Sequence, residues 1–210
     1  MKTNSLLLLL CASAMTACAD APAPTASHMS HDGGVALSDL ARAGNAQSLA
    51  ALKQFTVAFH DLDSATRAGY GLLKAPPATA ADGCISDPNA GGMGYHYTRG
   101  NNLTDDAIDL LDPEFLVYAP KEGPRTDGVA RTRLAAVEYF IPFSTQWPGP
   151  TDPTFARAPR LHDFTSTSEL PDLAFTPTAR FGGWMFHIWL WENNPAGMFE
   201  NFNSSVPLCR

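Results

Sequence analysis

Three histidines and one glutamate, far apart in the chain, have side chains that could bind a metal ion together: His60, His96, Glu138 and His187. Imidazole and carboxylate groups are common zinc ligands, and imidazole also binds copper, nickel and iron. Only a fold that brings four separate elements together could make one site of them. We therefore take a zinc or copper site formed by these four residues as the first hypothesis.

Glu138 is the most informative of the four because it interrupts the apolar run Leu134–Ile141. A carboxylate in the middle of such a strand is costly to bury unless it is paired or bound to a metal. Two other interpretations stay open. Glu138 could face water on a one-sided sheet, or it could be paired in the core with Arg99 or Arg133.

The histidines lie in different settings. His187 lies in a run that is apolar on both faces, which is typical of a central strand, so it is either a ligand or a core residue. His96 follows glycines that allow a close approach of the backbone. His60 falls at the margin of a helical apolar stripe, where a solvated histidine is the alternative. His28 and His31 lie in a polar linker and could at most bind copper weakly.

A second hypothesis needs no metal. Tyr95, Tyr97, Trp189 and Trp191 could line an aromatic pocket for a small molecule or a partner, or they could simply be core residues. A third hypothesis is hydrolysis by a histidine–carboxylate pair, although no nucleophile is marked. Motifs such as G-x-S-x-G, the P-loop and H-E-x-x-H are absent. The sequence leaves open whether the protein is an enzyme.

One long helix is predicted from about Asn45 to about Ala68, with a shorter helix over 38–43 before it. Asn45 suits an N-cap, and Gly69 can end the helix in a left-handed conformation. Apolar residues recur at steps of three and four and form one stripe: Leu49, Leu52, Phe55, Phe59 and Leu62.

Beyond the helix, short apolar or alternating runs between turn residues predict strands. They cover Met93–Thr98, Phe115–Tyr118, Leu134–Ile141 and Trp184–Trp191, and a proline-rich loop spans 143–180. We therefore expect a loop-rich α+β fold, with a mostly antiparallel sheet packed against one long N-terminal helix. Residues 37–210 are expected to form a single globular domain.

The N-terminus resembles a bacterial export signal over residues 1–17. Lys2 supplies the positive charge and Leu6–Leu10 an apolar core, which is too short for the roughly 20 residues of a membrane span. Met15-Thr16-Ala17-Cys18 resembles the lipobox of bacterial lipoproteins, with Met15 where leucine is usual. Attachment of lipid, including palmitate, to Cys18 is predicted; ordinary cleavage near Ala14 is the alternative.

An exported, lipid-anchored chain would lie in the cell envelope, facing the periplasm or the cell surface, with residues 18–36 as a flexible tether. Without the lipid it would be secreted. Two further cysteines, Cys84 and Cys209, are then left to form a disulfide in an oxidising compartment, with metal binding or free thiols as alternatives. The net charge of −7 and the lack of a basic stripe argue against a nucleic-acid partner.

Several of these segments together resemble a family of uncharacterised bacterial secreted proteins and lipoproteins. The shared motifs are G-x-H-Y, V-E-Y and H-x-W-L-W-x-x-N-P-x-G-x-F, found here at Gly94–Tyr97, Val137–Tyr139 and His187–Phe199. Phe59-His60-Asp61, Gly69-Tyr70 and Asn203–Cys209 match as well, whereas Arg99 stands where asparagine is expected. The resemblance supports the choice of site residues and implies no reaction.

Overall fold

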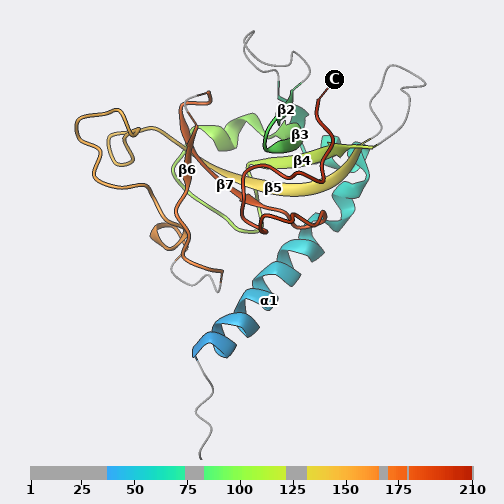
Figure 1. Cartoon of the computed structure of the whole chain (residues 1–210), viewed down its shortest axis with the longest axis horizontal. Coiled ribbons are helices and arrows are strands. Elements are labelled where there is room, and N and C mark those ends of the chain that lie inside the picture. The colour runs from blue at the N-terminus through green and yellow to red at the C-terminus, as the bar shows by residue number, and fades with distance from the viewer. Residues whose placement is uncertain (1–36, 74–82, 122–131, 166–169, 179, 210) are drawn as a thin grey trace, which may run out of the picture. The chain divides into compact units, whose positions relative to one another are not determined.

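The computed structural model describes residues 37–73, 83–121, 132–165, 170–178 and 180–209 (Figure 1). They belong to a compact unit that spans Val35–Arg210. Cys18, His28 and His31 lie outside the described residues, so lipid attachment and the tether stay predictions. No described helix combines the length and the apolar character that crossing a membrane requires.

The predicted antiparallel sheet is confirmed. Its seven strands are β1 (Gly71–Leu72), β2 (Cys84–Asp87), β3 (Gly91–Thr98), β4 (Phe115–Pro120), β5 (Thr132–Pro142), β6 (Thr176–Thr178) and β7 (Gly183–Ile188). The order across the sheet is β1-β3-β4-β5-β7-β6, and β2 also pairs with β3. The long, curved β5 lies between β4 and β7 in the middle of the sheet (Figure 1).

The prediction of one long N-terminal helix is not supported. The segment consists of α1 (Leu37–Thr56), a 3-10 turn η1 (Val57–His60) and α2 (Leu62–Arg67). The break falls at Asp61, whose backbone is extended and whose carboxylate accepts the amide hydrogens of Asp63 and Ser64. Asp61 therefore caps a new helix, since aspartate satisfies free amides at a helix start. Two further 3-10 turns are η2 (Gly100–Leu103) and η3 (Leu161–Asp163).

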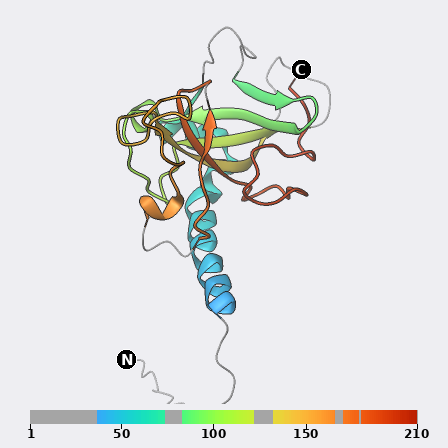
Figure 2. The ribbon, with the colours of Figure 1, turned by 60° about the vertical axis from the view of Figure 1, so that its left-hand side comes forward.

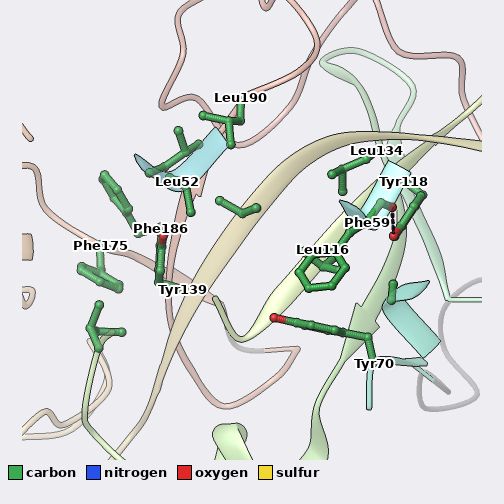
Figure 3. Packing of buried hydrophobic residues seen from close by; sticks show 14 of the residues in the cluster. Leu52, Phe59, Tyr70, Leu116, Tyr118, Leu134, Tyr139, Phe175, Phe186 and Leu190 are labelled. Carbon is green, nitrogen blue, oxygen red and sulfur yellow. Dashed lines mark hydrogen bonds between the residues drawn. The ribbon is translucent and has the colours of Figure 1, made fainter. Parts of the chain in front are cut away.

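The C-terminal end of α1, together with η1 and α2, packs against one face of the sheet. Leu52 of α1 and Phe59 of η1 share a buried apolar cluster with Tyr118 of β4 and Tyr139 of β5 (Figure 3). The Tyr118 hydroxyl donates to the Phe59 carbonyl at 2.6 Å, drawn as a dashed line. We call this side of the sheet the helix face. Because neighbouring side chains of a strand alternate in direction, Val117 and Glu138, which directly precede those tyrosines, point to the other face.

The predicted disulfide is confirmed. Cys84 of β2 is bonded to Cys209, and their Cα atoms are 5.8 Å apart. The bond fastens the C-terminal segment to the edge of the sheet, and both views show the C-terminal end of the chain near β2 (Figures 1 and 2). The chain is thereby closed between residues 125 positions apart.

Candidate metal centre

Three strands bring together three of the four predicted ligands. Glu138 of β5 lies directly opposite His187 of β7. His96 of β3 lies opposite Val117 of β4, and Val117 lies opposite Ala136 of β5, so His96 projects from the same face as Glu138. The ligating atoms of His96, Glu138 and His187 all lie within 4.8 Å of one another. This is the face opposite the helix face.

The three side chains are in direct contact and are sealed from solvent. The His96 Nε2 lies 3.0 Å from the Glu138 Oε1, and the His187 Nε2 contacts the same oxygen. His96 and Glu138 are fully buried, and the His187 side chain is 1% exposed. Burying three polar groups without compensation would cost several kcal/mol, so the contacts among them must offset that cost.

The structure excludes two interpretations of Glu138 that the sequence leaves open. Glu138 does not face water, because it is fully buried. It is not paired with an arginine either: Arg99 contacts Asp112 and Tyr70, and Arg133 contacts Glu192. The described partners of its carboxylate are two imidazoles.

A backbone hydrogen bond orients the His96 ring. The Nδ1 lies 3.0 Å from the carbonyl oxygen of Gly94. A carbonyl oxygen only accepts, so Nδ1 carries a hydrogen, and Nε2, which faces Glu138, is the atom that a metal could bind in place of a proton. Gly94 has φ +121°, and a Cβ there would lie 2.5 Å from the Tyr118 carbonyl oxygen. The backbone conformation of β3 that presents this carbonyl therefore requires glycine.

The centre also contains polar atoms without a hydrogen bond. Within the described part of the chain, Glu138 Oε2 and His187 Nδ1 are buried and have no hydrogen-bond partner. Buried polar atoms in proteins are nearly always satisfied, and exceptions call for an explanation such as a bound ion. A cation between the carboxylate and the imidazoles would satisfy the free carboxylate oxygen.

The electrostatics of the centre favour an ionised carboxylate. Burial by itself raises the pKa of Glu138, but the neighbouring His187 and His96 outweigh burial and hold that pKa well below its usual range. Glu138 is therefore a carboxylate at neutral pH, which is the form that binds a metal.

The structure does not bring His60 to this centre. His60 is exposed at the end of η1, and its ring packs against Trp191 with the ring centroids 4.4 Å apart. The reason is that the helical elements cover the helix face, whereas Glu138 projects from the other one. The metal ligands that the geometry supports are three, not the predicted four.

The four aromatic residues proposed as a pocket are divided between two clusters. Tyr95, Tyr97 and Trp191 belong to or pack against the cluster on the helix face. Trp189 lies in a separate buried cluster, and its indole N–H donates to the Glu200 carbonyl at 2.6 Å. The tryptophans and tyrosines thus act mainly as core residues.

A different pocket meets the centre. It has a volume of about 170 Å³, and its wall includes His96, His187, Met93, Met185 and Arg180. Sequence reasoning missed the last three residues. Met185 precedes His187 by two positions on the same strand, so alternation could have placed both on one face. Arg180 is the last residue of the proline-rich loop, and no pattern in the sequence marks it.

Comparison with known proteins finds no homologue that could support or contradict this site. No family model, no curated protein and no solved structure matches the chain.

Proposed function

We propose that this protein binds a divalent transition metal, zinc or copper, through His96, Glu138 and His187, and that it does so as a lipoprotein of the bacterial cell envelope. One observation carries the metal-binding part: two imidazoles and a carboxylate converge within 4.8 Å in a fully buried setting. Such a donor set is typical of protein-bound zinc and also suits copper.

The distance between His96 and Glu138 fits a metal with little rearrangement, whereas the His187 Nε2 contacts the same oxygen more closely and would have to move further from it. Two ligands about 2.1 Å from a tetrahedral ion lie roughly 3.4 Å apart. The His96 Nε2 and Glu138 Oε1 are separated by 3.0 Å, so a displacement of a few tenths of an ångström would admit the ion. The Gly94 carbonyl accepts from the His96 Nδ1 and directs Nε2 toward the centre, which is the usual arrangement behind a metal-bound histidine.

Three protein ligands leave one coordination position open. Structural zinc sites are usually closed by four protein ligands, whereas sites that bind or activate a small molecule keep a free position. In the described part of the chain the group consists of three residues, and the pocket lies beside two of them. A binding or reactive role is therefore favoured over a purely structural one.

The compartment is part of the proposal. The Cys84–Cys209 disulfide is expected of a protein outside the cytosol, which supports export. The lipobox-like sequence around Cys18 supports attachment to the membrane surface. Mass spectrometry of the mature protein would test this, since a lipidated N-terminal cysteine has a characteristic mass.

Metal analysis tests the binding itself. The full-length precursor should be exported in a bacterial host, purified without a polyhistidine tag and measured for bound metal, then stripped with a chelator and titrated with zinc and copper. We expect one equivalent of metal in the wild type. Glu138→Gln, which preserves side-chain volume, should lose it. His60→Gln is the matched control and should retain it.

Circular dichroism must show that Glu138→Gln keeps the sheet, so that lost binding is not lost folding. A wild-type protein that is metal-free and takes up neither ion would refute the proposal. Equal loss of metal in His60→Gln would refute the three-residue assignment.

A further inference from the structure

The pocket beside the metal centre has a composition that indicates its ligand. Two of the proposed metal ligands, His96 and His187, form part of the wall although their side chains are almost fully buried, so the pocket lies directly beside the metal centre. Much of the remaining wall is apolar and includes Phe181, Met185 and Phe202. A pocket of this kind binds the body of an organic molecule through apolar contacts and orients it through a few polar groups.

Arg180 supplies a positive charge that no carboxylate in the described part of the chain neutralises. Its guanidinium lies over the ring of Phe181, 5.9 Å from the ring centroid. Neither aspartate nor glutamate occurs among the described residues that line the pocket. Arginine stays protonated at neutral pH, so this charge is available to a ligand.

The sum of charges around the pocket favours binding of an anion. A divalent ion would bring two positive charges and Arg180 one, and the one carboxylate that binds the ion, Glu138, would offset one of these three, which leaves two uncompensated positive charges. Guanidinium groups bind carboxylates through two parallel hydrogen bonds. The open metal position and Arg180 therefore offer two points of attachment for one carboxylate-bearing ligand.

We infer that this pocket binds a small carboxylate with a short aliphatic body, whose negative charge is shared between the metal and Arg180; the inference rests on the proposed metal site. Phosphate would compensate the two positive charges more completely, but it would leave the apolar wall without contacts. A volume of about 170 Å³ leaves room for a molecule of several heavy atoms, and propionate and butyrate are suitable probes of this class.

The test uses the Co²⁺-loaded full chain, because the visible spectrum of Co²⁺ reports a change in its coordination. Butyrate is titrated into the wild type, and butyramide serves as its neutral isostere. We expect butyrate to change the spectrum and butyramide not to. Affinity should rise about fourfold for each methylene from acetate to butyrate, because each added group is buried against the apolar wall.

Arg180→Gln should weaken butyrate binding about tenfold or more, since a hydrogen bond to a charged group is lost. The affinity of the Arg180→Gln protein for Co²⁺ should equal that of the wild type. Arg67→Gln is the matched control, because Arg67 is an exposed arginine of α2, which packs on the helix face. It should bind both Co²⁺ and butyrate like the wild type.

The possible failures are distinguishable. A chain that binds no Co²⁺ refutes the metal site and this inference together. Co²⁺ binding without a response to butyrate, an equal response to butyramide, or a stronger response to inorganic phosphate refutes the carboxylate pocket and leaves the metal site standing. Butyrate binding that is unaffected in Arg180→Gln refutes the role of Arg180.

Discussion

Glu114, immediately before β4, should make the protein less stable as the pH rises, and Glu114→Gln should remove that effect. The side chain is only 3% exposed, and its carboxylate accepts the amide hydrogen of Phe140 at 3.2 Å. Burial, reinforced by the nearby Asp105 and Asp109, raises the pKa of Glu114 to about 8 against two hydrogen bonds from backbone amides that lower it.

The sign follows from comparing the folded and unfolded states. Below the unfolded pKa of 4.5, both states bind the proton and Glu114 has no effect on stability. Between 4.5 and about 8, the unfolded state releases the proton and the folded state retains it, so stability falls as the pH rises. Each pKa unit is worth about 1.4 kcal/mol, which gives a loss of about 3 kcal/mol between pH 5 and pH 7.5.

The assay is urea unfolding of the disulfide-intact, chelator-treated protein at several pH values between 5 and 7.5. Glutamine mimics the protonated carboxyl in shape and charge, so Glu114→Gln should gain about 3 kcal/mol relative to the wild type over this range. Glu200→Gln removes an exposed carboxylate and should follow the wild-type profile. If the wild type and Glu114→Gln differ by the same amount at every pH, the folded protein does not hold a proton on Glu114 and the reasoning is wrong.

Two further predictions concern covalent and backbone constraints. Replacing Cys84 and Cys209 by serine should lower the free energy of unfolding by about 5 kcal/mol in the loop-entropy model, because the bridged residues are 125 positions apart. An unchanged urea midpoint would contradict this. Gly94→Ala should cost on the order of 2 kcal/mol and weaken metal binding, because its Cβ would meet the Tyr118 carbonyl and shift the bond that orients the metal ligand. Gly100→Ala, where the space for a Cβ is open, should be nearly neutral; equal effects of the two alanines would refute the argument.

The long strands could be read from the sequence, and the short ones could not. Alternation of side chains predicted strands that overlap β3, β4, β5 and β7, because these strands have enough residues for the pattern to repeat. The two residues of β1 and the three of β6 carry no period at all. Such edge strands exist only through pairing with a neighbour, which a local pattern does not record.

The helix illustrates a different limit of pattern reading. The apolar stripe is predicted to run without interruption from Leu49 to Leu62. Leu52 and Phe59 are indeed buried in the cluster on the helix face, whereas Phe55 of the same stripe is 39% exposed. A 3-10 turn changes the angle per residue only modestly, so burial of the stripe does not require one continuous helix. Asp61 was the available signal of the break, since aspartate is a strong N-cap and is followed here by a helix.

The exclusion of His60 could have been argued from the sequence. On β5, Val137 and Tyr139 alternate with Glu138, so the larger apolar surface lies on the face away from the carboxylate. An amphipathic helix buries most apolar area on that face, as it does here against Tyr139. A helix residue then cannot reach Glu138. His96 and His187 can reach it, because alternation can place them on the same face as Glu138. What the sequence does not contain is the pairing of β3 with β4, of β4 with β5 and of β5 with β7, and this pairing brings the three side chains within reach of one ion.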